Sequence, residues 1–163
     1  MAKLFLICGI PGSGKSTFLS QYVKKPTSIV ISRDKIRFSL LKEGEDYFLH
    51  EPIVEQMFYS GISKALQLGY DVFVDQSSIS VSARKKLLNK VFGYSEVNII
   101  WIDTPKSICI ERDSHREGRA KVGPRVINNM FSHFSPPTFQ EKFKHIYKYT
   151  DNKLIELKKE DDL

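Results

Sequence analysis

Eight residues near the start of the chain constrain its fold more than any other segment. They are Gly9-Ile10-Pro11-Gly12-Ser13-Gly14-Lys15-Ser16, which match G-x-x-x-x-G-K-[ST] at every position. In this motif the glycines let successive backbone N–H groups point at phosphate oxygens, and the following helix adds its positive N-terminal end. The apolar residues 3–7 predict a buried strand before the motif, and residues 15–23 predict a helix after it. We therefore expect a strand, a phosphate-binding loop and a helix.

The side chains of this loop have distinct expected roles toward a nucleoside triphosphate, for which ATP is our candidate. Lys15 is expected to reach the β- and γ-phosphates and to take part in catalysis. Ser16 is expected to place its hydroxyl on Mg²⁺. The other expected nucleotide contacts in this segment come from Gly12, Ser13, Gly14 and Thr17.

The rest of the chain alternates between β-rich apolar segments and segments with helical spacing. The predicted strands are residues 3–7, 28–31, 71–74, 97–102 and 145–149. The predicted helices are residues 15–23, 36–42, 52–68, 82–92, 106–115 and 124–134. This alternation predicts an α/β fold in which a five-stranded parallel sheet carries helices on both faces. We expect one domain over residues 1–163, frayed from residue 158 onward.

Two carboxylates follow predicted strands, and ligands of parallel sheets bind at the carboxyl ends of the strands. Asp34 could accept the proton of an attacking hydroxyl, which makes it our candidate general base. Arg37 follows on the same helix face and could bind a phosphate of the acceptor. Asp75 could hold Mg²⁺, directly or through water, or orient the acceptor hydroxyl. The plainer alternatives are a helix N-cap for Asp34 and a strand-end turn for Asp75.

The arginine-rich segment 112–125 has the composition of a mobile lid. Gly118 and Gly123 give its backbone freedom. Arg112 and Arg116 are expected to bind nucleotide phosphates when the lid closes. Arg116 is our candidate for the arginine that stabilises the transition-state charge. The remaining cations, expected on the lid surface or in contact with the acceptor, are Arg119, Lys121 and Arg125.

The net charge of +6 and the pI near 9.2 favour polyanionic partners. The charge gathers in three clusters, 33–37, 84–86 and 112–125, for which a solvated basic face is the alternative explanation. Two distant cysteines favour reduced thiols in a cytoplasmic protein. We see no signal peptide and no apolar run of the roughly 20 residues that cross a membrane, so no membrane partner is expected. The oligomeric state is left open.

Four segments, in order, resemble the 5′-kinase domain of the phage-type polynucleotide kinases, within the small P-loop kinases that include zeta toxins. They are PGSGKST (11–17), RDKIR (33–37), VDQ (74–76) and RDSHR (112–116) with the run to Pro124. The resemblance implies a P-loop kinase fold, with Asp34 as general base and Arg37 on the acceptor's phosphate. It also implies that Arg112 and Arg116 engage ATP. The third segment departs from the family's Ser-Asp-Thr, although Asp75 carries over.

The activity that this resemblance implies is transfer of the ATP γ-phosphate to a 5′-hydroxyl of DNA or RNA. The 3′-phosphatase motif D-x-D-x-T of bifunctional relatives is missing, so we expect kinase activity only. Other acceptors stay open: a nucleoside, a nucleotide sugar as in toxin-like relatives, or a modified DNA base. A further alternative is a nucleotide-binding module without catalysis.

Overall fold

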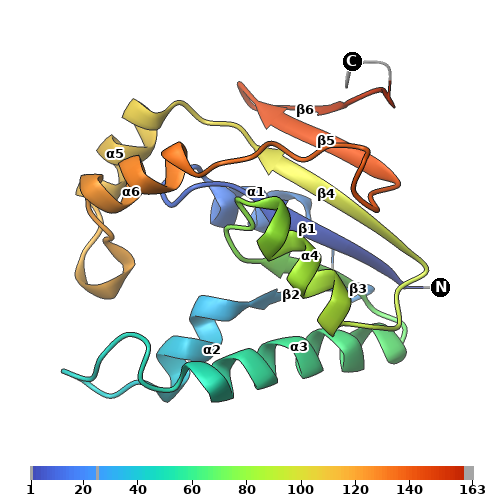
Figure 1. The fold of residues 1–163 in the computed structure, drawn as a ribbon, viewed down its shortest axis with the longest axis horizontal. Helices are drawn as coiled ribbons and strands as arrows, with labels where there is room; N and C mark the ends of the chain where they lie inside the picture. Colours follow the sequence, from blue (N-terminus) through green and yellow to red (C-terminus); the bar gives the residue numbers. More distant parts are fainter. Residues whose placement is uncertain (1, 25, 160–163) are drawn as a thin grey trace.

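The computed structural model describes residues 2–24 and 26–159 (Figure 1). Its elements in chain order are β1 (Lys3–Cys8), α1 (Lys15–Tyr22), β2 (Ser28–Ser32), α2 (Arg33–Leu40), α3 (Glu51–Gln67), β3 (Asp71–Asp75), α4 (Val81–Lys90), β4 (Glu96–Ile102), α5 (Lys106–Ser114), the 3₁₀ turn η1 (Gly118–Ala120), α6 (Pro124–Ser132), β5 (His145–Thr150) and β6 (Lys153–Glu156). The predicted fraying from residue 158 falls mostly on residues outside the described ones. No helix among the described residues is long and apolar enough to cross a membrane.

The sheet confirms the predicted α/β fold and adds one strand to it. Its order is β2-β3-β1-β4-β5-β6, and β1 to β5 pair in parallel. The prediction of five strands is wrong by one, because β6 pairs antiparallel with β5 at the edge. Asp151 and Asn152 make the tight turn between them with φ of 49° and 59°. All four residues of β6 are exposed, so the strand carries no buried alternation that would have indicated it.

Helix α2 begins earlier than the sequence predicted. We expected it over 36–42, whereas it starts at Arg33, directly after β2. Ser32 is its N-cap, and the Ser32 hydroxyl accepts a hydrogen bond from the Lys35 N–H at 3.3 Å. Asp34 therefore lies in the first turn of the helix and is not its N-cap. The other helices and strands agree with the predicted ranges to within two residues at each end.

Helices cover both faces of the sheet (Figure 1). Phe18 and Leu19 of α1 pack with Ile7 of β1 on one face. On the other face α3 and α4 supply a larger core that includes Phe58 and Leu87. Because side chains alternate along a strand, Ile7 and its neighbours Leu6 and Cys8 face opposite layers. This arrangement anchors β1 on both sides immediately before the phosphate-binding loop.

Arg84 is turned into the protein, so its assignment to a basic surface cluster is wrong. Its side chain is fully buried and pairs with Glu141 at 2.8 Å. It also donates hydrogen bonds to the carbonyl oxygens of Ser78 and Ser135, at 2.9 and 3.0 Å. These bonds tie the loop that follows β3 to the segment that follows α6. The loop after β3, which carries Gln76, is thereby fixed.

Candidate active site

The phosphate-binding loop connects β1 to α1 and depends on two glycines. Gly12 has a φ of 84°, and a Cβ at this position would overlap the carbonyl oxygen of Cys109 in α5. Gly14 has a φ of 103° and is the N-cap of α1. Both values lie in the region that L side chains rarely adopt. The glycines of the motif thus serve backbone curvature and the close approach of α5.

Lys15, the first residue of α1, curls back over this loop. Its Nζ donates a hydrogen bond to the carbonyl oxygen of Gly9 at 3.0 Å. Burial lowers the pKa of Lys15, while the nearby carboxylate of Asp75 works in the opposite direction. A cation held at the loop in this way is positioned to meet phosphate oxygens.

Ser16 and Asp75 line one cavity of about 670 Å³. A hydroxyl and a carboxylate are oxygen ligands that suit Mg²⁺, which commonly combines one or two protein oxygens with substrate phosphates. The two side chains therefore fit the predicted metal role. Within the described residues, no three His, Cys, Asp or Glu side chains gather into a metal centre. The assignment of Ser16 and Asp75 to Mg²⁺ stays a prediction.

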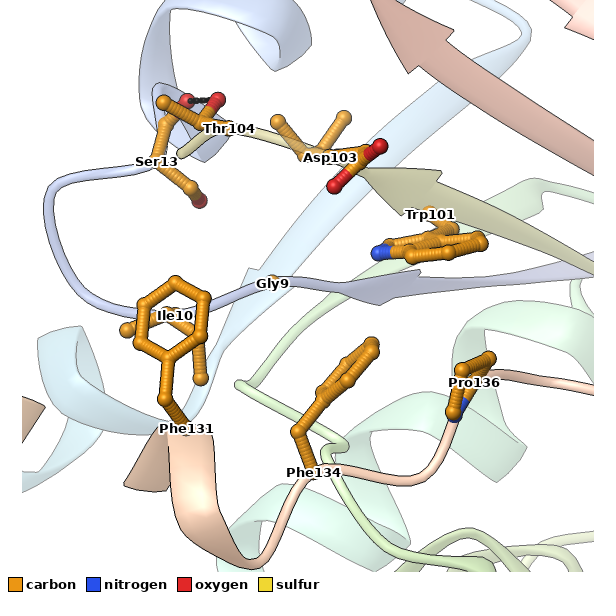
Figure 2. A pocket seen from close by; sticks show the side chains of 10 residues that line it. Gly9, Ile10, Ser13, Trp101, Asp103, Thr104, Phe131, Phe134 and Pro136 are labelled. Carbon is orange, nitrogen blue, oxygen red and sulfur yellow. Dashed lines mark hydrogen bonds between the residues drawn. The ribbon is translucent and has the colours of Figure 1, made fainter. Parts of the chain in front are cut away.

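Helix α5 is fastened to the back of the loop. Arg112 donates through Nη1 to the carbonyl oxygens of Ser13 and Gly12, at 3.2 and 3.4 Å. The hydroxyl of Thr104 donates to the same Ser13 oxygen at 2.8 Å, which is the dashed line in Figure 2. The predicted lid arginine thus holds the loop's backbone and also borders the cavity described next.

A cavity of about 700 Å³ opens on the side of the loop where α1 begins. It brings together most of the predicted nucleotide contacts, namely Gly12, Ser13, Gly14, Thr17, Arg112 and Arg116. The sequence analysis did not predict the residues that form its other walls. They come from Phe18 and Gln21 on α1, from residues 103–105, and from residues 149–152 at the β5–β6 turn. The Asp-Asn pair of that turn, flanked by β-rich residues, was the available signal.

A second cavity, of about 730 Å³, opens on the other side of the loop. Lys15 reaches it from α1, Asp34 and Arg37 reach it from α2, and Asp75 reaches it from the end of β3. We call it the acceptor cavity. The predicted nucleotide and acceptor contacts therefore divide between two cavities that share the phosphate-binding loop, with Lys15 facing the acceptor side. Ser16 lines neither of them and borders the 670 Å³ cavity with Asp75.

The carboxylate of Asp34 is exposed but held in place. Its side chain is 58% exposed, and it accepts hydrogen bonds from Arg37 and from the Tyr47 hydroxyl, the latter at 2.6 Å. Burial and the bond to Asp34 raise the pKa of Tyr47 to about 12, so the phenol keeps its proton at neutral pH. Asp34 therefore presents a fixed, solvent-accessible carboxylate to the acceptor cavity.

Arg37 differs from the open phosphate ligand that the sequence suggested, because its side chain is only 6% exposed. Glu51, the first residue of α3, accepts hydrogen bonds from its Nε at 3.0 Å and its Nη2 at 2.7 Å. Glu51 also accepts from Nη2 of Arg33 at 2.8 Å. Burial works against the charged form of Glu51, but the bonds from Arg37 and Arg33 hold its pKa below the ordinary value. Sequence reasoning missed Glu51.

The lid segment forms a loop between α5 and α6. Asp113 is buried, and its carboxylate accepts from the N–H groups of Val122 and Gly123, at 3.0 and 2.8 Å. At the tip, Nη2 of Arg119 donates to the carbonyl oxygen of Glu45 at 2.5 Å, in the loop between α2 and α3. The lid thus touches the opposite rim of the acceptor cavity. Its mobility and the catalytic role of Arg116 stay predictions.

A phosphate-binding loop at the carboxyl edge of a parallel sheet, followed by lysine, serine and strand-end aspartates, defines a P-loop domain with the α/β kinase fold. The family model described as an AAA domain, AAA_33, matches residues 4–137, and the chain belongs to this family. Membership of this family implies that the domain binds ATP.

Similar proteins share this fold. The L-seryl-tRNA(Sec) kinase of Methanococcus maripaludis is 28% identical over 141 residues, which cover 82% of this chain and 53% of the relative. The Pnkp1/Rnl/Hen1 RNA repair complex contains a chain with a TM-score of 0.71 and 19% identity, covering 81% of this chain and 43% of that one. The PezAT toxin–antitoxin system of Streptococcus pneumoniae contains one with a TM-score of 0.65 and 20% identity, covering 95% and 71%. This chain thus spans about half the length of the L-seryl-tRNA(Sec) kinase, a curated relative.

Proposed function

We propose that this domain transfers the γ-phosphate of ATP to the 5′-hydroxyl end of DNA or RNA. The observation that carries the proposal is the Asp34 carboxylate. It lies on the acceptor cavity together with Lys15, exposed to solvent, and is oriented by Arg37 and Tyr47. A module that only binds nucleotide needs no carboxylate fixed in this way.

In the proposed reaction the acceptor hydroxyl loses its proton to Asp34 as its oxygen forms a bond to the γ-phosphorus. The bond between that phosphorus and the β–γ bridging oxygen breaks, and ADP leaves. Lys15 offsets the negative charge that builds up on the phosphates. Mg²⁺, held by Ser16 and Asp75, supplies further charge neutralisation when bound. Arg116, which borders the nucleotide cavity, is our candidate for the transition-state arginine.

A polymeric acceptor is supported by the lining of the acceptor cavity. Cationic side chains on it include Arg33, Lys86, Arg119 and Lys121. Phe48 also lines it with 64% of its surface exposed, available for stacking on a base. A basic surface with an exposed aromatic ring suits a phosphate backbone better than a neutral metabolite.

The decisive experiment is incubation with Mg²⁺ and γ-labelled ATP in the presence of a 5′-hydroxyl oligonucleotide. We expect label at the 5′ end, no label on a matched 5′-phosphorylated oligonucleotide, and a rate that falls steeply as salt is raised. Strong labelling of a nucleoside or sugar, with none on the oligonucleotide, would contradict the proposal. It would favour the small-acceptor alternatives instead.

A second candidate acceptor is a seryl hydroxyl carried by a tRNA, because the curated relative is named an L-seryl-tRNA(Sec) kinase. The same Asp34 chemistry applies to that hydroxyl. Mild alkaline deacylation separates the two candidates. Label on a seryl group leaves the tRNA as phosphoserine, whereas label at a 5′ end stays with the RNA.

A further inference from the structure

A recess behind the phosphate-binding loop belongs to neither of the two substrate cavities. It has a volume of about 220 Å³ and lies between the end of β4 and the segment that follows α6 (Figure 2). Its lining includes the aromatic residues Trp101, Phe131 and Phe134, and Pro136. An engineered apolar cavity of about 150 Å³ holds benzene, so this recess has room for one planar ring system.

One polar group in the recess has no partner. The hydroxyl oxygen of Ser13 is buried, and it makes no hydrogen bond within the part of the chain that the structure describes. Ser13 as a whole is 4% exposed, and Figure 2 shows its hydroxyl turned into the recess. Its carbonyl oxygen, by contrast, is bonded to Thr104 and Arg112. Because unpaired buried hydroxyls are unfavourable, this atom favours an occupant that can hydrogen-bond to it.

The charge around the recess disfavours a cation. Lys148 forms an ion pair with Asp103 at 3.2 Å, and its Nζ lies 4.7 Å from the ring centroid of Trp101. The carboxylate and the aromatic face that would attract a positive ligand are therefore already engaged by a lysine. Asp103 keeps accepting capacity on its remaining lone pairs, which suits a neutral ligand with an N–H donor.

We propose that this recess binds a neutral planar nitrogen heterocycle of the nucleobase class. The ring packs among Trp101, Phe131 and Phe134, a ring nitrogen accepts from the Ser13 hydroxyl, and an amino group donates toward Asp103. Ser13, Asp103 and Thr104 also border the nucleotide cavity, so the site shares a wall with it. The inference does not depend on which acceptor the enzyme uses.

Trp101 is the single tryptophan of the chain, so its emission reports on the recess directly. The protein is first saturated with ADP to fill the nucleotide cavity and is then titrated with adenine, cytosine or benzene. We expect adenine and cytosine to change the Trp101 emission saturably, with benzene binding more weakly because it offers no polar group. Calorimetry on the same samples gives the affinities.

Two serine variants locate the site. Ser13→Ala should weaken adenine and cytosine binding about two- to tenfold, as expected for one hydrogen bond. Ser78→Ala is the matched control, because its hydroxyl is also buried with no partner among the described residues, and Ser78 lines the acceptor cavity and not the recess. It should leave the affinity unchanged. Phe131→Leu, which removes one aromatic wall and leaves Ser13 in place, should weaken both bases and serves if Ser13→Ala does not fold.

Four results would overturn the proposal. They are the absence of a saturable response to either base, equal binding of benzene, equal base affinity in the Ser13 and Ser78 variants, and displacement of the bases by additional ADP. The last result would mean that the bases had entered the nucleotide cavity.

Discussion

Glu51 grips the guanidinium of Arg37 along one edge, with its two carboxylate oxygens 3.0 and 2.7 Å from Nε and Nη2. The remaining nitrogen, Nη1, donates to Asp34 and to the Tyr47 hydroxyl. The orientation of the candidate base on α2 therefore depends on a carboxylate from the start of α3. Arg37 in this arrangement positions Asp34, and the role in acceptor binding that the sequence suggested is still untested.

Replacing Glu51 with glutamine should impair catalysis without loss of ATP binding. Glu51→Gln removes the charge that fixes Arg37, and small misplacements of catalytic groups cost about 100-fold in rate. We expect kcat to fall about 10- to 100-fold, and the free energy of unfolding to fall by about 1–3 kcal/mol. Steady-state kinetics and denaturant unfolding measure both. Glu55→Gln, one turn along α3, is the control and should keep near-normal kcat.

The Glu51 network should also make stability depend on pH. The folded-state pKa of Glu51 lies below its ordinary 4.5, so its contribution is complete above that value and is lost as pH falls through the lower folded pKa. The difference in unfolding free energy between wild type and Glu51→Gln should therefore be constant near neutral pH and shrink below about pH 4.5. Denaturant titrations at a series of pH values test this. A difference that stays constant down to about pH 3 would contradict the assignment.

Removing the candidate base should separate binding from chemistry. Asp34→Asn keeps the size of the side chain but can no longer take a proton, so phosphoryl transfer should fall about 10²–10⁴-fold. ATP affinity, measured by calorimetry, should stay close to that of the wild type. Glu43→Gln, an exposed carboxylate change in the neighbouring loop, controls for charge. Near-normal turnover in Asp34→Asn would remove Asp34 as the base.

Gly12 of the phosphate-binding loop and Gly118 of the lid should respond differently to alanine. Both have positive φ, but a Cβ at Gly12 overlaps the backbone of Cys109, whereas nothing lies within 4 Å of a Cβ at Gly118. Gly12→Ala should lower the free energy of unfolding by about 2–4 kcal/mol and impair ATP binding. Gly118→Ala should cost about 1 kcal/mol. Equal losses would mean that backbone strain alone, rather than the approach of α5, requires Gly12.

The sequence predicted the elements whose signals are local. The phosphate-binding motif and the strand–helix alternation each depend on neighbouring residues, and both matched the structure. Strand β6 was not predicted because its four residues are all exposed. Its only signal in the sequence was the turn at Asp151 and Asn152. The predicted start of α2 was wrong because Ser32 was not recognised as the N-cap. Its hydroxyl accepts a hydrogen bond from the Lys35 N–H.

Within the candidate site, the residues missed are those whose role arises only from packing. Glu51 lies 14 positions after Arg37, and no local pattern links the two. The far wall of the nucleotide cavity comes from the β5–β6 turn, more than a hundred residues after the phosphate-binding loop. Arg84 was read as surface charge because a sequence does not show that Glu141 will meet it.

The buried carboxylate of Asp113 connects the two ends of the lid loop. It accepts hydrogen bonds from the N–H groups of Val122 and Gly123, so both ends of the intervening loop are tied at one point. Arg116, which borders the nucleotide cavity, and Arg119, which reaches Glu45 across the acceptor cavity, sit on that same closed loop. If the lid moves as predicted, the two arginines would move together. The predicted lid closure would therefore couple the two sites, because a movement that brings Arg116 onto the nucleotide would also bring Arg119 toward the proposed acceptor.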